Sequence, residues 1–336
     1  MICAGQGKIR MKHLFIVNPV AGKMKREEKL SKVRRAVEEL PQELKKDSEF
    51  EIYETKAPLD ACAKIRADAA ECDELRVYAY GGDGTLNECV NGAAGFENVA
   101  VTHYPCGTGN DFIKTFGDDK QRFFDLRELI GGEVRKIDLV RCNDRYSVNI
   151  CSVGIDARIG TEVHKYSSIP VIGGATGYVT SAMVNLFKGV NQPLAIDCAG
   201  RHFDGKFALV CICNGRYYGG GFNPVPTAMV DDGVLDVLIV NHVSRLQFLT
   251  LIGTYAKGQY KKMPHYITHV RGQSLSIDSE TELVVNLDGE AMNSRHIDIE
   301  LIPGGLGFIF PANMDYFKNQ TACPEEKRSK WEISVS

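Results

Sequence analysis

The sequence predicts a two-part protein, with a parallel α/β sheet in the N-terminal part and a β-rich, antiparallel C-terminal part. Up to about residue 135, short apolar runs alternate with amphipathic helical patterns, which is typical of parallel strands joined by helices. Beyond that point strand-like runs dominate and few helical patterns intervene. A length of 336 residues suits about two domains. We place them at 11–135, with a return at about 303–317, and at 136–302, between frayed termini at 1–10 and 318–336.

The N-terminal elements follow one another as strand–helix units. The predicted strands are residues 14–17, 51–55, 75–79 and 99–104. Helices are predicted after the first three strands, at about 30–40, at 59–70 and from Thr85 onward. Because parallel strands end at the same edge of a sheet, the segments that follow them should converge there on a ligand. These segments contain Asn18, Thr55 and the turns at 81–85 and 107–111.

A glycine-rich turn joins the third strand to its helix. It reads Gly81-Gly82-Asp83-Gly84-Thr85-Leu86-Asn87-Glu88. Thr85 and Glu88 have the spacing of a capping box, which predicts a helix that begins at Thr85. Backbone N–H groups and the helix dipole would attract a phosphate here. Asp83 would repel that phosphate unless a divalent cation came with it, so the turn indicates a metal–nucleotide. A Rossmann turn would need glycine in place of Asn87, and the sequence has no Walker pattern.

Two more turns follow predicted strands in the N-terminal part. They read Asn18-Pro19-Val20-Ala21-Gly22 and Gly107-Thr108-Gly109-Asn110-Asp111. The first is a weak signal alone, and its place at the end of a strand strengthens it. In the second, Thr108 and Asn110 can donate to phosphate, and Asp111 can join a metal or water network. We interpret both turns as parts of the nucleotide site.

The C-terminal part contains two acidic turns. Its predicted strands are 145–152, 207–213, 234–240, 274–278, 282–287 and 296–302, its helices 176–188 and 246–260, and 306–310 returns as a last strand. Asp288 and Glu290 stand where strand 282–287 ends. They form either an acidic hairpin turn or a site whose carboxylate accepts the proton of an acceptor hydroxyl. The turn at 229–236 lacks the EF-hand ligands, and a hard cation held by one carboxylate and backbone carbonyls stays open there.

Composition narrows the class of protein. A formal net charge of −3 without a long Lys/Arg block argues against nucleic acid as a partner. The 11 cysteines contain no CxxC pair, which favours a reducing cytosol. The segment 169–190 is too polar to span a bilayer, so we expect a cytoplasmic protein with peripheral membrane contact. His265 and His269 have helical zinc spacing, but Pro264 and the β-rich setting make them loop residues.

Five segments occur in the order found in diacylglycerol kinase catalytic domains, and the chain resembles that family over about residues 11–317. They are Asn-Pro-x-Ala-Gly at 18–22, Gly-Gly-Asp-Gly-Thr-Leu-Asn-Glu at 81–88, Gly-Thr-Gly-Asn-Asp at 107–111, an Asp-Gly turn after Pro226-Thr227-Ala228, and Leu-Asp-Gly-Glu at 287–290. The chain looks most like bacterial soluble lipid kinases of the diacylglycerol kinase and YegS-like type. The glycine turn alone is shared with NAD kinases and phosphofructokinases.

The resemblance implies a fold and a site. The fold would be a phosphofructokinase/NAD-kinase-like α/β domain with a parallel sheet, followed by a C-terminal β-sandwich. ATP with Mg²⁺ would bind at Asn18, Pro19, Val20, Ala21, Gly22, Thr55, Gly81, Gly82, Asp83, Gly84, Thr85, Leu86, Asn87, Gly107, Thr108, Gly109 and Asn110. Asp83 and Asp111 would organise metal-bound water. Asp288 would be the catalytic base, beside Glu290. A structural Mg²⁺ would take the Asp232 carboxylate and the carbonyls of Met229 and Val234.

One departure weakens this assignment, because Thr55 is followed by Lys56 and Ala57 where the family commonly has Gly-His-Ala. The implied function is ATP-dependent phosphorylation of a lipid hydroxyl at the membrane surface, with diacylglycerol as the first choice and phosphatidic acid as its product. An NAD kinase and a non-catalytic lipid-binding protein on the same fold are the alternatives. A homodimer stays open.

Overall fold

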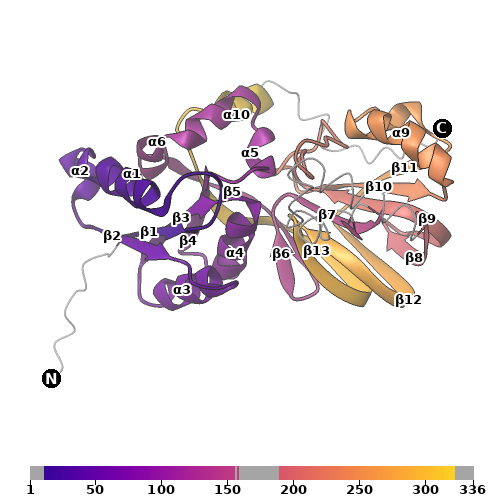
Figure 1. Ribbon diagram of the computed structural model, residues 1–336, viewed down its shortest axis with the longest axis horizontal. Helices are drawn as coiled ribbons and strands as arrows, with labels where there is room; N and C mark the ends of the chain where they lie inside the picture. The colour runs from indigo at the N-terminus through magenta and orange to yellow at the C-terminus, as the bar shows by residue number, and fades with distance from the viewer. Residues whose placement is uncertain (1–10, 156, 159–188, 322–336) are drawn as a thin grey trace. The chain divides into compact units, whose positions relative to one another are not determined.

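The computed structural model describes residues 11–155, 157–158 and 189–321, which fall into two compact units. The N-terminal unit contains the chain up to Ile137 together with the segment from Gly304, and the C-terminal unit contains residues 138–303 (Figure 1). Two separate segments of chain therefore build the N-terminal unit. The predicted helix at 176–188 lies outside the described residues.

The N-terminal unit alternates strands and helices, as its sequence pattern predicts. Its elements are β1 (Met11–Val17), α1 (Arg26–Glu38), α2 (Gln42–Lys45), β2 (Ser48–Glu54), α3 (Asp60–Ala69), β3 (Glu74–Gly81), α4 (Asp83–Ala93), β4 (Val99–Pro105), α5 (Asp111–Lys114), the 3₁₀ helix η1 (Gly117–Phe124), α6 (Leu126–Ile130), the first half of β5 (Glu133–Cys142), the end of β13 (Glu290–Phe310) and α10 (Asp315–Thr321).

The sheet of this unit is parallel, in the order β13-β4-β3-β1-β2. The side chains from Leu14 to Val17 in β1 are completely buried, because α1 and α6 cover one face of the sheet and α3 and α4 the other (Figure 1). A strand covered on both faces needs apolar residues at successive positions, which explains the unbroken apolar run. The carboxyl ends of β1, β3 and β4 lie at one edge, where the three predicted turns follow them.

An aromatic cluster fixes the returning end of β13 in the N-terminal unit. Phe308 pairs in register with Val101 of β4. The Phe308 ring lies 5.2 Å from that of Phe112, and the Phe310 ring lies 5.3 Å from that of Phe116. Aromatic pairs at these separations add to the free energy gained by burying their surface. The end of β13 thereby packs against α5 and against Phe116, the residue that precedes η1.

The C-terminal unit consists mainly of strands. Its elements are the second half of β5, β6 (Arg145–Ser147), β7 (Ile150–Gly154), β8 (Gln192–Cys198), β9 (Arg201–Cys213), β10 (Leu235–Asn241), α9 (Arg245–Ala256), the 3₁₀ helix η2 (Tyr260–Lys262), β11 (Ile267–Gly272), β12 (Ser274–Leu287) and most of β13. Its strands pair in the order β11-β10-β9-β7-β12-β13, with β8 paired to β9 and β12. Each of these pairings that involves β7, β8, β9, β10, β11 or β12 is antiparallel.

Alternation along β9 gives this sheet two apolar faces. Val210 and Ile212 belong to a cluster shared with β7, β10 and β12. Leu209 and Cys211 belong to a second cluster, which includes Tyr255 of α9. Successive side chains of a strand point to opposite faces, so one face packs against other strands and the opposite face packs against α9. The apolar run in β9 reflects burial on both faces.

Several elements differ from the sequence-based prediction. The strands predicted at 274–278 and 282–287 form one strand, β12, with an irregularity between Asp278 and Leu283. The strands predicted at 296–302 and 306–310 are likewise one strand, β13. Polar residues interrupt the apolar–polar alternation of both strands, so the prediction divided each strand into two. β5, β8 and β11 were not predicted. None of the described helices is long and apolar enough to cross a membrane.

Candidate active site

Two glycine turns of the N-terminal unit touch each other through their backbones. Gly81 ends β3, and Gly82 is the N-cap of α4. A Cβ on Gly107 would lie only 2.6 Å from the Gly82 Cα, so the two turns pack as closely as glycine alone allows. The predicted convergence of these two turns is therefore present in the N-terminal unit.

The capping-box prediction for Thr85 is wrong. α4 begins at Asp83, and no described side chain caps its N-terminus. The Thr85 hydroxyl instead accepts a hydrogen bond of 3.1 Å from the Asn18 side-chain amide. An uncapped helix N-terminus that follows a glycine turn is suited to bind an anion through its backbone N–H groups.

Asp83 and Asp111 both lie close to Gly109. The Asp111 backbone N–H donates to Asp83 Oδ1 at 2.7 Å. A Cβ on Gly109 would lie 2.6 Å from Asp83 Oδ2 and 3.7 Å from Asp111 Oδ2. Lys114 Nζ also donates to Asp111 Oδ1, at 2.5 Å. Two carboxylates within reach of one point suit a divalent cation that accompanies a phosphate.

The turn at 18–22 joins the same group through Asn18. The Asn18 backbone N–H donates to the Tyr80 carbonyl, and its side-chain oxygen accepts from the Val20 N–H, both at 3.1 Å. Gly22 has φ +67°, and a Cβ there would lie 1.8 Å from the Cys106 carbonyl oxygen. Only glycine fits this position. All three predicted turns thus pack together within the N-terminal unit.

A buried lysine that the sequence analysis missed supports the first turn. Lys29 of α1 is completely buried, and its Nζ donates to the carbonyls of Asn18 (2.8 Å), Pro19 (3.2 Å) and Ala21 (2.6 Å). The sequence does hold a signal, because Lys29 is four residues before Val33 and seven before Ala36, on the buried stripe of α1. A lysine at a core position of a helix beside a functional turn could have been singled out.

His103 holds the glycine turn through a hydrogen bond to its backbone. Its Nε2 lies 3.1 Å from the Gly81 carbonyl oxygen, and the side chain is fully buried. Burial lowers the pKa of His103 to about 4, so the ring is neutral at pH 7. Because a carbonyl oxygen only accepts, Nε2 carries the proton and donates it to Gly81.

The other residues predicted to contact ATP differ from one another in their surroundings. The Thr55 N–H donates to the Val17 carbonyl, which places it beside the end of β1, and within the described residues no contact joins its side chain to the glycine turns. Asn110 exchanges hydrogen bonds with its own turn, at the Gly107 N–H and carbonyl. Leu86 is buried and can meet a ligand only through its backbone. Thr108 is exposed.

Asp288, in the C-terminal unit, lies in a two-residue hairpin turn between β12 and β13. Asp288 has φ +54° and Gly289 has φ +102°, values typical of a type I′ turn. The Asp288 carboxylate accepts hydrogen bonds from Ser147 Oγ (2.5 Å) and from the backbone N–H groups of Val148, Asn149 and Ile150 (3.0–3.1 Å). These donors fix its orientation and attach the hairpin to the 147–150 segment. Glu290 is exposed at the start of β13.

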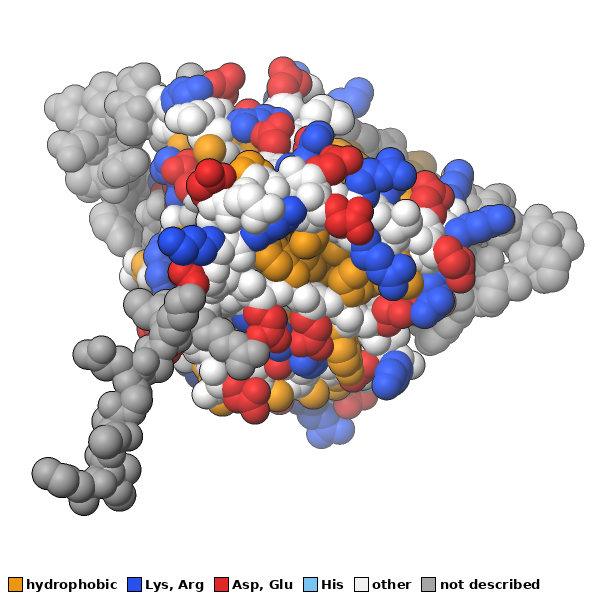
Figure 2. Space-filling model, turned by 90° about the vertical axis from the view of Figure 1, so that its left-hand side faces the viewer, with side chains coloured by type: hydrophobic (Ala, Val, Ile, Leu, Met, Phe, Trp, Pro, Cys, Tyr) orange, Lys and Arg blue, Asp and Glu red, His pale blue; other side chains and the backbone are white. Residues whose placement is uncertain are grey.

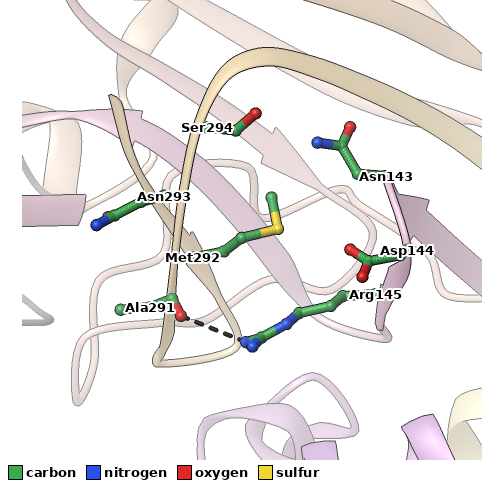
Figure 3. Close-up of a pocket in the computed structure, with 7 residues that line it drawn as sticks. All are labelled: Asn143, Asp144, Arg145, Ala291, Met292, Asn293 and Ser294. Carbon is green, nitrogen blue, oxygen red and sulfur yellow. Dashed lines mark hydrogen bonds between the residues drawn. The ribbon is translucent and has the colours of Figure 1, made fainter. Parts of the chain in front are cut away.

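An open depression of about 430 Å³ lies beside this hairpin. It is lined by Asn143, Asp144, Arg145, Ala291, Met292, Asn293 and Ser294 (Figure 3). The Arg145 guanidinium spans it and donates to the Ala291 carbonyl at 3.3 Å. The lining is polar, so it suits a polar group better than a hydrocarbon chain.

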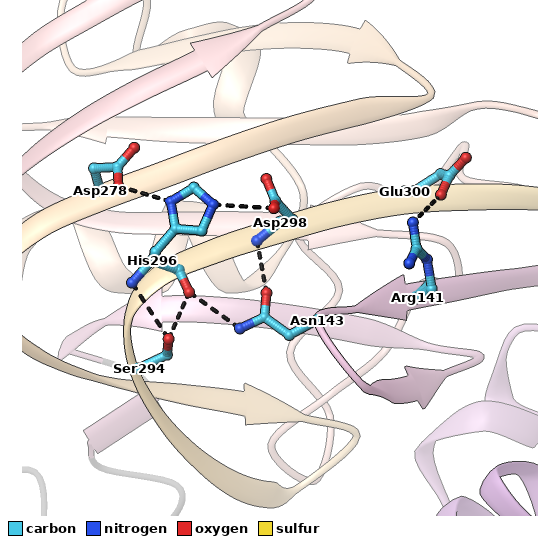
Figure 4. A network of polar contacts seen from close by, with 7 residues as sticks. All are labelled: Arg141, Asn143, Asp278, Ser294, His296, Asp298 and Glu300. Atoms are coloured by element: carbon cyan, nitrogen blue, oxygen red, sulfur yellow. Dashed lines mark hydrogen bonds and ion pairs between the residues drawn. The ribbon is translucent and has the colours of Figure 1, made fainter.

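A polar network holds the strands around this depression. The His296 ring lies between Asp278 (2.7 Å) and Asp298 (3.0 Å), and Asn143 is hydrogen-bonded to the backbone of His296 and Asp298 (Figure 4). Hydrogen bonds to Asp278 and Asp298 raise the pKa of His296. The network joins β12, β13 and the turn at Asn143, so we assign it a structural role.

The turn predicted to hold a structural Mg²⁺ fits a cation in part. Asp232 accepts from the Val234 N–H (3.2 Å) and from Arg271 (3.1 Å). Burial raises the pKa of Asp232 to about 7, with Arg271 acting in the opposite direction and Asp236 and Asp138 adding to the rise. Buried neighbouring acids favour a cation, but Arg271 already neutralises part of the charge. Among the described residues, no group of three His, Cys, Asp or Glu side chains could hold a metal.

Charged side chains of both signs are mixed on the surface in view in Figure 2. One face of the molecule, shown in Figure 2, carries basic and acidic side chains side by side rather than a field of one sign. A nucleic-acid site would need a basic stripe or patch.

Comparisons with known proteins cover both units. Residues 12–142 match the family described as diacylglycerol kinase catalytic domain, and residues 149–310 match the YegS C-terminal NAD kinase beta sandwich-like domain. A protein of Shewanella frigidimarina (strain NCIMB 400) named "Probable lipid kinase YegS-like" is 29% identical over 245 residues, which are 71% of this chain and 77% of that protein. A solved structure described as a diacylglycerol kinase from Bacillus anthracis str. Sterne has 26% identity and a TM-score of 0.64, covering 90% of this chain and 98% of its own.

Proposed function

Because this chain belongs to the diacylglycerol kinase family of lipid kinases, we propose that it transfers the terminal phosphoryl group of ATP to the hydroxyl of a lipid alcohol. Diacylglycerol is the first acceptor to test, and phosphatidic acid would be its product. The observation that carries the proposal is the contact between the turns at 81–85 and 107–111, with Asp83 and Asp111 beside it. We also propose that the protein is cytoplasmic and meets its acceptor at the membrane surface.

The N-terminal unit would hold the nucleotide. Backbone N–H groups of the glycine turns and of the start of α4 would bind the phosphates, as helix N-termini do in general. Asp83 and Asp111 would hold Mg²⁺ directly or through water, and the ion would supply charge neutralisation on the transferred phosphoryl group. Lys29 and His103 would keep the turns in shape from behind, because each donates to carbonyls of these turns.

Asp288 would accept the proton of the acceptor hydroxyl, and Glu290 is the neighbouring candidate. The two can be separated by experiment. Asp288→Asn cannot accept all four of the present hydrogen bonds, so it would also disturb the turn. Glu290→Gln changes an exposed side chain and leaves the turn intact. Loss of a general base costs roughly 10²–10⁴ in turnover. A loss of that size in Glu290→Gln, with normal stability, would move the base from Asp288 to Glu290.

The direct test is incubation with labelled ATP and Mg²⁺ in the presence of mixed micelles of diacylglycerol, other lipid alcohols, or NAD. We expect label in a lipid product and loss of that product in Asp83→Asn. Label in NAD would favour an NAD kinase. Lipid binding without any transfer of label would favour a non-catalytic lipid-binding protein.

A further inference from the structure

Helix α9 (Arg245–Ala256) has exposed leucines on its outer side in addition to the apolar residues of its inner side. Phe248, Leu251 and Ile252 are partly buried against the core, and Tyr255 is 4% exposed. On the opposite side Leu246 is 73% exposed and Leu249 is 54% exposed. A surface helix normally carries charged or polar residues on its outer face, and a helix apolar all round is found in a core or in a lipid environment. Arg245, Gln247 and Thr250 of α9 are exposed as well, so the two leucines lie on the surface beside polar side chains.

Helical spacing places the exposed residues on one stripe. Leu246, Leu249 and Gly253 are three and four residues apart, and Lys257 follows at the next turn, just after the end of α9. All four are exposed. The helix is firmly defined, because Ser244 and Gln247 form a capping box at its start. The stripe is thus a defined surface, which we call the α9 stripe.

The segment of chain that contains the α9 stripe carries charge of one sign. From Val237 to Ile277 the chain contains no Asp or Glu, although the whole sequence contains 43 of them. Exposed Lys257, Lys261 and Lys262 follow the helix. No ion pair joins these lysines to a carboxylate in the part of the chain that the structure describes. In contrast, the basic residues of α1 are interspersed with Glu27, Glu28, Glu38 and Glu39.

We infer that the α9 stripe and the three lysines after it dock this protein onto an anionic lipid bilayer. Exposed leucines next to lysines that form no ion pair within the described residues match the two parts of a bilayer surface, since leucine enters the apolar boundary and lysine meets the anionic headgroups. A second copy of the chain would bring the same lysines together and repel them. The inference rests on the proposed function only in that a lipid acceptor resides in such a surface.

Cosedimentation with vesicles tests the docking without any turnover. The full chain is mixed with vesicles of phosphatidylcholine alone or of phosphatidylcholine with phosphatidylglycerol. We expect binding to the anionic vesicles that weakens with salt. Each lysine near an anionic surface contributes roughly fivefold in affinity, so Lys257→Gln/Lys261→Gln/Lys262→Gln should bind about a hundredfold more weakly. Leu246→Ser/Leu249→Ser should lose at least about tenfold.

Matched variants elsewhere serve as controls. Lys32→Gln/Arg34→Gln/Arg35→Gln removes the same number of charges from the exposed side of α1 and should bind like the unaltered chain. Leu59→Ser removes an apolar side chain that is 61% exposed and should also have no effect. Equal binding by the α9 variants and the controls would overturn the inference. So would a dimer in solution that Leu246→Ser/Leu249→Ser converts to monomer while vesicle binding stays the same.

Turnover of a short-chain, water-soluble acceptor separates this inference from the proposed function. The α9 variants should retain that turnover, because α9 contributes no residue to the proposed site. If the unaltered chain lacks the turnover but binds anionic vesicles, the kinase proposal fails and the docking inference stands. If it has the turnover but ignores the vesicles, the docking inference fails alone.

Discussion

Lys29 shows how a single buried charge can fix the backbone of a turn, here the turn at 18–22. Its ammonium group has three hydrogens, and each meets a carbonyl of the turn at 18–21. Carbonyls that point inward to Lys29 leave the other side of this turn free to face a ligand. Burial of an ammonium group is costly unless its hydrogen bonds are satisfied, and here the backbone satisfies them. The side chain is thus a positioning residue for the proposed nucleotide site.

Replacing Lys29 by Met should reduce both stability and nucleotide affinity. Three partly buried carbonyls would lose their donor, and the free energy of unfolding should fall by about 3 kcal/mol. Lys32→Met, on the exposed side of the same helix, should change it by less than about 0.5 kcal/mol. Urea unfolding with and without ATP measures both quantities. Equal unfolding of the two variants would contradict the positioning role of Lys29.

Replacing Gly107 by Ala should separate the two glycine turns. The added Cβ would meet the Gly82 Cα at 2.6 Å, and neither backbone can yield without moving its turn. We expect a large loss of kinase activity, on the order of 10²-fold, since small displacements of positioning groups have effects of this size. Gly131→Ala, whose Cβ would find only ordinary contacts beginning at 3.4 Å, is the control. Full activity in Gly107→Ala would show that the turns tolerate separation.

At the scale of the elements, the sequence predicts where strands and turns lie better than it predicts which side chains contact one another. Apolar runs and glycine turns located β1 to β4 and the three turns, because burial on both faces of a parallel sheet leaves a clear pattern. The pattern could not show that Thr85 would turn toward Asn18 instead of capping α4, since that depends on a contact between residues 67 positions apart. Lys29 was missed although its partners lie only 8–11 positions earlier in the chain, because the pattern of α1 marks a core position and does not show what the ammonium group contacts. Its partners are carbonyls of another segment.

The hairpin at Asp288 was predicted both as an acidic turn and as a catalytic site. The structure has the turn, and the role of its carboxylate stays a prediction. Asp288 holds three consecutive backbone N–H groups of the 148–150 segment. No local pattern could reveal this, because the donors are about 140 residues earlier in the chain. A short polar turn can therefore link distant strands.

Removing the Ser147 hydroxyl tests how far the orientation of Asp288 matters. Ser147→Ala loses one of the four hydrogen bonds to the carboxylate and should lower the free energy of unfolding by about 1–2 kcal/mol. If Asp288 accepts the substrate proton, turnover should fall while the KM for ATP stays constant. A variant with lower stability but unchanged turnover would assign Asp288 a purely structural role.

At the scale of the whole molecule, two buried histidines set the response of the N-terminal unit to acid. Burial lowers the pKa of His13 to about 4, with Arg76 adding to the effect, and burial lowers the pKa of His103 to about 4. Both pKa values are below the usual 6.5 of the unfolded chain. Between pH 6.5 and pH 4 the unfolded state therefore binds more protons than the folded state, and stability falls as the pH falls.

We expect the two histidines together to make the protein roughly 4 kcal/mol less stable at pH 5 than at pH 7.5. His13→Phe should remove about half of this difference, because a phenyl ring can replace the imidazole that stacks on Phe50 and Tyr78. Urea unfolding of both proteins at the two pH values measures it. The same pH difference in the variant and the unaltered protein would show that His13 does not titrate in this way.

Strand β13 decides when the protein can finish folding during synthesis. Its first part pairs with β12 in the C-terminal unit, and its last residues pair with β4 in the N-terminal unit. The ribosome makes β4 first, then the whole C-terminal unit, and only afterwards Gly307 and Phe308. Until then β4 is an edge strand of the N-terminal sheet without this partner, and such an open edge promotes aggregation. A chain truncated before residue 304 would leave that edge permanently exposed.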